Sequence, residues 1–459
     1  MLDRRAALIA TGSGLLAAPP AVAATSAVTP VTAPVTAVDV PAPIVGPRIN
    51  FAQAEKIMTE LGLDAIVVGS GVNFYHATGL DLSATRMGHA PGSYAIITRR
   101  QDQRLALVAH AFAYYYTIAQ DHRHADYPVY LFTAPANDAP VVGEAEPAAL
   151  PGEPFRDRGE APLDEIERFR AAALMSAQAQ RAAQASLMFA VRKALTDLGV
   201  ANGRIAVDVP PVWRTVAEAA PKAAIVDADD ALRRIRPVKS DVEIALMRQA
   251  AQNNAAAALE AVQTVRAGGD VRDLRAAYFA AAARRGMRGV FMVINRVSSP
   301  TYAATFRDGQ CFSIDCVSEY MGYHGDYARS VFIGEPPANM KKVTAAAAAA
   351  WDSIREIIRP GVKFSEVRAR GKETLKKMGV DYNISFTPHS VGLYHDDADG
   401  SAGLPRREDI VLEKGYTLSV DCPLLEAGAG GSHHLEDLTL LTADGGEQIN
   451  DTGQRTITV

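Results

Sequence analysis

Residues 313–334 read SIDCVSEYMGYHGDYARSVFIG and contain two aspartates, Asp315 and Asp326, each flanked by apolar or β-branched residues. We expect both carboxylates to be buried. A buried carboxylate pair costs free energy unless a cation neutralises it. The stretch therefore predicts either a bound metal ion or an ion pair with the nearby Arg329.

The same stretch predicts two neighbouring strands. The runs 313–317 and 328–333 are apolar and β-branched, as buried strands are. Between them lie residues typical of a turn, namely Gly322, His324 and Gly325. Two such strands, folded back on each other, would bring Asp315 and Asp326 side by side.

Three later segments each add a side chain that can bind a metal ion. They are 387–393 (TPHSVGL) with His389, 419–423 (SVDCP) with Asp421, and 434–441 (HLEDLTLL) with Glu436. Together with the two aspartates they provide one imidazole and four carboxylates, mostly on expected strands. This oxygen-rich set suits one or two divalent ions such as Mn²⁺, Co²⁺ or Zn²⁺.

The order of these motifs resembles the catalytic domain of the M24 metallopeptidases, the pita-bread fold of methionine aminopeptidase, Xaa-Pro aminopeptidase and prolidase. The family's metal ligands run Asp, Asp, His, Glu, Glu. They are matched here by Asp315, Asp326, His389, Asp421 and Glu436. Two runs around them also match, with Tyr323 and Arg329 beside the second aspartate, and Gly392, Leu393 and His395 after the histidine.

The resemblance implies a hydrolase with two divalent metal ions that share a hydroxide, acting on small peptides with an Xaa-Pro bond. It implies that Asp421 is both a ligand and the group that moves a proton to the leaving nitrogen. His395 would contact the substrate. Tyr323 and Arg329 would orient the carboxylates.

Three departures from the family pattern bear on the activity. Asp421 stands where the family has Glu, which retracts the carboxylate by one methylene, roughly 1.5 Å. His395 follows His389 by one residue fewer than usual. Residues 295–307 contain no histidine, whereas peptidases of the family carry one there.

Two alternatives to a peptidase therefore stay open. The first keeps the fold and changes the chemistry, as in creatinase, which cuts a C–N bond without metal, or the metal-dependent dimethylsulfoniopropionate lyase, which removes a proton and breaks a C–S bond. A lyase needs a base that is not a ligand, and Asp396 or Asp397 could serve. The second alternative is a binding module without metals, which the presence of all five ligand-capable side chains argues against.

Composition bounds the rest of the chain. It has 459 residues, 48% of them hydrophobic and 22% charged, with a formal net charge of −5. This length predicts two domains. The absence of a basic stripe with interleaved aromatic residues argues against nucleic acid as a partner. The family resemblance implies a homodimer.

The N-terminus predicts export. Residues 1–24 combine Arg4 and Arg5, a short apolar run and the small-residue cleavage site AVA at 21–23, which is typical of a signal peptide. The arginine pair fits both a twin-arginine signal and an ordinary secretory signal. We expect a periplasmic protein with no stable membrane span after cleavage, and a Pro/Thr/Ala-rich linker over 25–48.

Two folded domains are expected after the linker, an α/β (α+β) architecture overall. Residues 49–236 alternate helix and strand patterns and resemble the N-terminal domain of creatinase and prolidase, with a loop at 71–79 and a long Ala-rich helix at 163–198. Residues 237–459 would form the pita-bread catalytic domain. Its cysteines are expected to be small buried residues, and a disulfide between two of them stays open: Cys311, Cys316 and Cys422.

Overall fold

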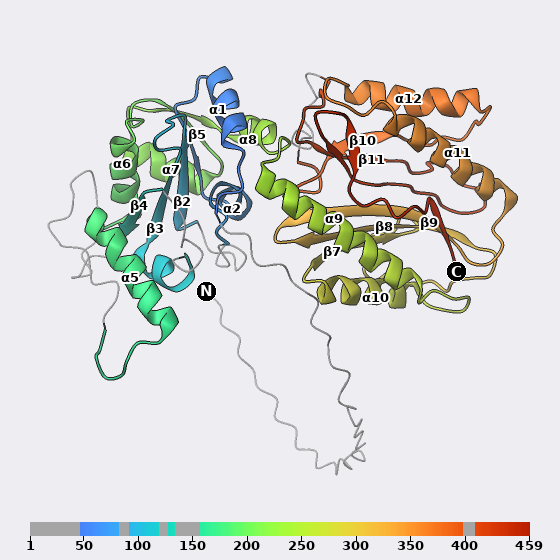
Figure 1. Cartoon of the computed structure of the whole chain (residues 1–459), viewed down its shortest axis with the longest axis horizontal. Coiled ribbons are helices and arrows are strands. Elements are labelled where there is room, and N and C mark those ends of the chain that lie inside the picture. Colours follow the sequence, from blue (N-terminus) through green and yellow to red (C-terminus); the bar gives the residue numbers. More distant parts are fainter. Residues whose placement is uncertain (1–45, 82–90, 119–126, 134–156, 398–408) are drawn as a thin grey trace, which may run out of the picture. The chain divides into compact units, whose positions relative to one another are not determined.

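The computed structural model describes residues 46–81, 91–118, 127–133, 157–397 and 409–459 (Figure 1). The predicted signal peptide and most of the predicted linker lie outside the described residues. In the ranges given above, no helix combines the length and the apolar character needed to cross a membrane.

The first half of the chain forms a mixed six-stranded sheet between two layers of helices. Its strands, in the order β4-β3-β2-β1-β5-β6, are β1 (Ala65–Val68), β2 (Ser93–Thr98), β3 (Leu105–His110), β4 (Val129–Phe132), β5 (Arg204–Val207) and β6 (Ala224–Asp227). Alternate residues of β1 enter different cores: Ile66 and Val68 face one, Ala65 and Val67 the other. This arrangement confirms the predicted α/β layer.

Each core is closed by its own helices. The first contains side chains of α1 (Phe51–Glu60), α2 (Gly71–Thr78), α5 (Glu165–Gln180) and α8 (Asp229–Ile235), and the second those of α6 (Leu187–Asp197) and α7 (Pro210–Ala219). A short helix, α4 (Ala111–Ala113), and a π-helical turn (Tyr114–Ile118) follow β3.

Two predictions in this half are wrong. Residues 71–78 form α2 rather than a loop, because the Ser70 hydroxyl caps the helix by accepting from the Asn73 N–H and Gly79 ends it with φ +75°. The predicted helix at 163–198 is broken into α5 and α6. Gln184 lies between the two helices and forms a β-bridge with Phe132 at the end of β4. Its backbone hydrogen bonds are therefore made to that strand and not within a helix.

The second half of the chain contains two four-stranded sheets, each with a pair of helices (Figure 1). One sheet has the order β14-β9-β8-β7, with β7 (Arg288–Ile294), β8 (Cys311–Tyr320), β9 (Tyr323–Phe332) and β14 (Thr456–Thr458). It packs against α9 (Asp241–Val262) and α10 (Val271–Arg284), which share its core. The other sheet has the order β10-β11-β12-β13.

The strands of that second sheet are β10 (Thr387–Ser390), β11 (Thr417–Asp421), β12 (Thr439–Leu441) and β13 (Gly446–Gln448). Its core is shared with α11 (Ala338–Arg355) and α12 (Phe364–Lys377). The two sheets are joined where Ala328 of β9 and Glu436 exchange backbone hydrogen bonds. Strands of the N-terminal sheet all precede residue 236 and those of the other sheets follow it, although the domain limits themselves stay a prediction.

The β8–β9 hairpin is tighter than predicted. Tyr320 pairs with Tyr323, so the loop is only Met321 and Gly322, both with positive φ (47° and 84°), as a two-residue hairpin with a type I′ turn requires. Gly325 lies in the strand rather than in the turn. A side chain there would collide with Ala250 and Asn254 of α9, so the glycine permits the helix to pack closely.

Cys311, Cys316 and Cys422 are buried and free of disulfides. Their burial confirms the prediction that they are small core residues.

Candidate metal centre

The first two candidate ligands lie on one face of the β8–β9 hairpin. Asp315 is opposite Ala328, and Val317 is opposite Asp326. Because side chains two positions apart on a strand share a face, Asp315 and Asp326 are diagonal neighbours on the same side of the sheet. Cys316, between Asp315 and Val317, points to the other side.

The same geometry recurs on β10 and β11. His389 is opposite Ser419, and Thr387 is opposite Asp421. His389 and Asp421 are therefore also diagonal neighbours on one face of their sheet. Glu436 comes from the segment that bridges the two sheets, where its backbone pairs with Ala328. All five predicted ligands are thus supplied by strands or by the connection between the two sheets.

These side chains converge. Three overlapping groups have potential ligand atoms within 4.8 Å of one another: Asp326, His389 and His395; His389, Asp421 and Glu436; and Asp315, Asp326 and Glu436. His389 Nε2 lies 3.2 Å from Glu436 Oε1, 3.5 Å from Asp421 Oδ2 and 3.7 Å from Asp326 Oδ2. The groups contain the five predicted ligands and His395, so these residues could hold divalent ions.

Burial differs among the carboxylates. The side chains of Asp326 and Glu436 are essentially inaccessible, whereas that of Asp421 is 27% exposed. Asp421 is therefore the most accessible of the five predicted ligands, since the Asp315 side chain is 18% exposed and that of His389 5%.

The pKa values of the carboxylates are shifted in opposite directions. Burial, reinforced by the Asp326 charge, raises the pKa of Asp315 to about 7 and that of Glu436 well above its usual value. Burial opposes ionisation of Asp326 as well, but His395 and His389 outweigh it and hold the pKa of Asp326 below its usual range. These opposite pKa shifts show that several carboxylates lie close together at this centre.

The histidines carry the balancing charge. Burial acts to lower the pKa of each, but the surrounding carboxylates outweigh it and raise the pKa of His389 to about 10 and that of His395 to about 9. Divalent ions would replace these protons as the neutralising charge.

Several buried oxygens at the centre have no partner. Asp315 Oδ1, Asp326 Oδ1 and Glu436 Oε2 lie within the described residues without a hydrogen-bond donor. Unpartnered buried carboxylate oxygens are costly, and ligation of a hard cation would satisfy them. The donor set of carboxylates and imidazoles therefore fits divalent metal ions.

His395 lies at the edge of this cluster. Its Nε2 is 3.2 Å from Asp326 Oδ2, and its backbone carbonyl oxygen is 3.1 Å from His389 Nδ1. The Phe291 ring packs edge-on against the His395 ring, with centroids 5.3 Å apart. Despite its shortened spacing from His389, His395 thus reaches the same centre.

Arg329 binds next to the centre. Its Nη1 donates to the backbone oxygen of Glu436 at 2.8 Å, and its Nη2 donates to Asp437 Oδ1 at 2.6 Å. The alternative ion pair of Arg329 with Asp315 or Asp326 is not formed, because the guanidinium is directed at Asp437. Arg329 acts on Glu436 through the backbone.

Tyr323 lies apart from the carboxylates that it was expected to orient. Its hydroxyl group donates to Glu243 Oε1 at 3.1 Å, near the first turn of α9.

His434 is a member of the site that the motif comparison did not assign. Its Nε2 lies 3.1 Å from Asp421 Oδ1 and 3.7 Å from Glu436 Oε2, and its Nδ1 lies 4.0 Å from Asp315 Oδ2. Its position two residues before Glu436 was the available signal, since alternate residues of an extended segment share a side. Ser419 was also missed, and its hydroxyl hydrogen bonds to Glu436 Oε1.

Asp397 does not provide a free base. Its side chain, 1% exposed, lies between Arg236 Nε at 3.2 Å and Lys239 Nζ at 3.1 Å. Burial acts to raise the pKa of Asp397, but Lys239 and Arg236 outweigh it and leave that pKa below its usual value. A carboxylate held by two cations is a weak proton acceptor.

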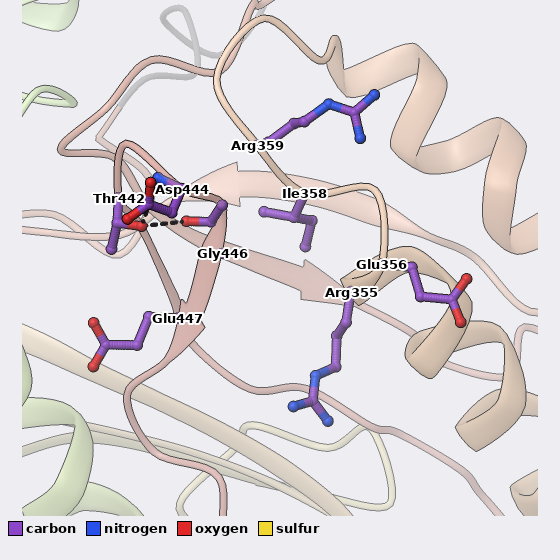
Figure 2. A pocket seen from close by; sticks show the side chains of 9 residues that line it. Arg355, Glu356, Ile358, Arg359, Thr442, Asp444, Gly446 and Glu447 are labelled. Atoms are coloured by element: carbon purple, nitrogen blue, oxygen red, sulfur yellow. Dashed lines mark hydrogen bonds between the residues drawn. The ribbon is translucent and has the colours of Figure 1, made fainter.

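An open hollow of about 370 Å³ lies elsewhere, beside the end of α11 and the β12–β13 turn (Figure 2). Figure 2 shows Arg355, Glu356, Arg359, Asp444 and Glu447 around it. None of the candidate ligands lines it, and we assign it no role.

Comparisons with known proteins place the site in a family. Residues 245–443 match the model of "Metallopeptidase family M24". The "Probable dipeptidase PepE" of Mycobacterium tuberculosis (strain ATCC 25618 / H37Rv) is 29% identical over 244 residues, which cover 50% of this chain and 63% of the relative, less than two thirds of its length. The creatinase of Bacillus sp. (strain B-0618) is 26% identical over 289 residues, covering 58% of this chain and 70% of the relative.

A solved structure extends the likeness to most of the chain. The dipeptidase of Pyrococcus horikoshii OT3 superposes with a TM-score of 0.62 at 17% identity, covering 89% of this chain and 99% of that one. This likeness confirms the predicted fold class, an α/β N-terminal part followed by the pita-bread part. The part of the chain that carries the converging carboxylates and histidines is a member of metallopeptidase family M24.

Proposed function

We propose that the chain is a metal-dependent peptidase that hydrolyses small peptides at an Xaa-Pro bond, as an aminopeptidase or dipeptidase. One observation carries the proposal: Asp315, Asp326, His389, Asp421 and Glu436 form overlapping groups of potential ligands at one buried centre. Similarity to proteins named dipeptidase and Xaa-Pro dipeptidase supports the peptide as substrate.

The centre would hold two divalent ions, of Mn²⁺, Co²⁺ or Zn²⁺. Asp326 and Glu436 each belong to two of the three ligand groups, and the group that they share also contains Asp315. We propose that these two carboxylates would help to hold the two ions. When bound, such ions lower the pKa of a coordinated water and polarise a substrate carbonyl.

The chain's own residues would supply proton transfer and positioning. Asp421, with 27% of its side chain exposed, can accept a proton at Oδ2 and return it to the leaving nitrogen. His395, 35% exposed at the edge of the cluster and packed against Phe291, can donate a hydrogen bond to the substrate. Arg329 would hold Glu436 in place through its backbone.

A second function, a C–N hydrolase that acts on a small amide other than a peptide, is favoured by one observation. Asp421 is shorter than the glutamate of the family pattern, and proton transfer is sensitive to a shift of this size. The creatinase of Bacillus sp. is among the relatives.

The deciding experiment measures metal content and hydrolysis together. Purified protein is stripped, reloaded with Mn²⁺, Co²⁺ or Zn²⁺, and assayed on a panel of Xaa-Pro dipeptides and tripeptides. We expect about two ions per chain and cleavage that His389→Ala abolishes. Two ions with cleavage of other amides but of no peptide would support the second function. Absence of bound metal under every loading condition would refute the first function.

Export and assembly belong to the same proposal. We propose that residues 1–24 direct the protein to the periplasm and that it acts there as a homodimer. Cell fractionation of the full chain and of a chain lacking residues 1–24 tests the first. Sedimentation equilibrium tests the second, and a monomer at micromolar concentration would contradict it.

A further inference from the structure

His434 lies close to three of the candidate ligands. Its Nε2 lies 3.1 Å from Asp421 Oδ1 and 3.7 Å from Glu436 Oε2. Its Nδ1 lies 4.0 Å from Asp315 Oδ2, and its side chain is 11% exposed. The neighbouring His433 is directed elsewhere, toward the Ser330 hydroxyl at 2.7 Å.

The Nε2 distances are those of ligands around a common ion. With metal–ligand bonds of about 2.0–2.2 Å, two ligands of one ion lie roughly 3–3.5 Å apart. His434 Nε2 is within or near this distance of Asp421 and Glu436, and so is His389 Nε2 at 3.5 and 3.2 Å. The two imidazoles therefore approach the same two carboxylates at different oxygens: His434 at Asp421 Oδ1 and Glu436 Oε2, and His389 at Asp421 Oδ2 and Glu436 Oε1.

Because the side chain at position 421 is shorter than a glutamate, there is room beside it for another metal ligand. Asp421 reaches roughly 1.5 Å less far than a glutamate would. The adjoining Glu436 Oε2 has no hydrogen-bond partner among the described residues, and His434 Nε2 is the imidazole nitrogen 3.7 Å away. A cation between these atoms would satisfy the oxygen and the imidazole together.

We propose that His434 is a sixth metal ligand, bound through Nε2 to the ion that Asp421 and Glu436 hold. The centre then offers four carboxylates and two coordinating imidazoles, and His434 offsets the shorter reach of Asp421. The inference rests on the proposed metal centre, but it does not depend on which bond the enzyme cleaves.

The test compares His434→Asn with His433→Asn. Asparagine removes the imidazole and is a poor ligand, and His433 is a buried neighbour that faces Ser330. Metal-free proteins are titrated with Co²⁺, followed by calorimetry and visible absorption. Imidazole ligands are counted by pulsed electron paramagnetic resonance of the Cu²⁺-loaded proteins.

We expect His434→Asn to weaken one ion by about 100-fold or more, to change the Co²⁺ spectrum and to remove one imidazole coupling. A group that only orients a ligand would cost roughly 10- to 100-fold in affinity and leave the imidazole count unchanged. We expect His433→Asn to leave affinity and spectrum as in the unsubstituted protein. An unchanged imidazole count in His434→Asn would overturn the proposal.

Two controls keep the result interpretable. Thermal unfolding of the metal-free proteins shows whether His434→Asn folds, and His434→Gln replaces it if it does not. Because every readout is metal binding, loss of the sixth ligand is seen even if no Xaa-Pro peptide is cleaved. Conversely, peptide cleavage with an unchanged imidazole count would overturn the role of His434 and leave the proposed function standing.

Discussion

Replacement of Arg329 by methionine should be the most damaging change next to the metal centre. The guanidinium donates to four acceptors: the backbone oxygens of Gln454, Ala328 and Glu436, at 2.6, 2.8 and 2.8 Å, and Asp437 Oδ1 at 2.6 Å. Neither side chain of the Arg329–Asp437 pair is exposed. Methionine keeps an unbranched apolar side chain but leaves all four acceptors without this donor.

The expected cost follows from the burial of the pair. Removing one partner of a buried ion pair costs about 3–5 kcal/mol, because the other charge stays buried. Arg455 Nη1, 3.6 Å from Asp437 Oδ2, stays beside that charge and offsets part of this cost. For a domain of this size each kcal/mol lowers Tm by roughly 2–4 °C, so we expect a fall of roughly 6–20 °C. Burial already raises the pKa of Asp437, and protonation of its carboxyl group at low pH should reduce the penalty.

The assay is thermal and urea unfolding of metal-free Arg329→Met, Arg329→Met/Asp437→Leu and Arg248→Met. Arg248 pairs with Glu447 at the surface, with side chains 36% and 46% exposed, so its replacement should cost no more than about 1 kcal/mol. The double variant should be more stable than Arg329→Met, because it removes a buried charge whose only remaining cation among the described residues is Arg455, with Nη1 3.6 Å from Asp437 Oδ2. A cost below about 1 kcal/mol for Arg329→Met, or a double variant less stable than it, would refute the reasoning.

Three other outcomes are expected. Asp397→Leu strands the buried cations of Arg236 and Lys239 and should cost about 3–5 kcal/mol in urea unfolding, and a cost under about 1 kcal/mol would show that the cations are solvated. Gly392→Ala should also destabilise the protein in urea unfolding, because its methyl group would collide with Asp397 Oδ2 and Lys239 Nζ, and an unchanged midpoint would contradict this contact. In metal-free protein the pKa of His389 lies near 10 rather than 6.5, since Glu436 and its neighbours outweigh burial, so its stabilisation is complete below about pH 6.5 and is lost as the pH rises toward 10. The Tm of protein kept metal-free with a chelator should therefore fall over this pH range, and a Tm that rises would count against a protonated His389.

Much of the site could be predicted from sequence because its ligands obey the two-residue period of strands. Asp315 and Asp326 share a face of one hairpin, and His389 and Asp421 share a face of another pair of strands. The apolar and β-branched runs around Asp315 and Asp421 are typical of buried strands, so these strands could be recognised by their composition. The order of the motifs along the chain then indicated which side chains belong to one centre.

What the sequence could not supply depends on contacts between distant segments. The Tyr323 hydroxyl binds Glu243 rather than a ligand, and Asp397 is held by Arg236 and Lys239, which are far away in the sequence. Neither pairing leaves a local pattern. The helix α2 was missed for a local reason, because the Ser70 cap and the glycine after the helix were interpreted as parts of a loop.

The position of Asp421 links the chemistry of the centre to its structure. It is the most exposed predicted ligand, and the only one of the five whose residue type departs from the family pattern. A substrate would therefore meet the metal centre beside Asp421, which is shorter than the glutamate of the family pattern, and beside His434, whose Nε2 lies 3.1 Å from Asp421 Oδ1. If the two residues compensate each other, Asp421→Glu should be tolerated poorly while His434 is present, because the added methylene, roughly 1.5 Å long, would drive the carboxylate into the imidazole. Asp421→Glu combined with His434→Asn should then bind metal better than Asp421→Glu alone. If the double variant instead binds metal as the sum of the two single losses predicts, the residues act independently.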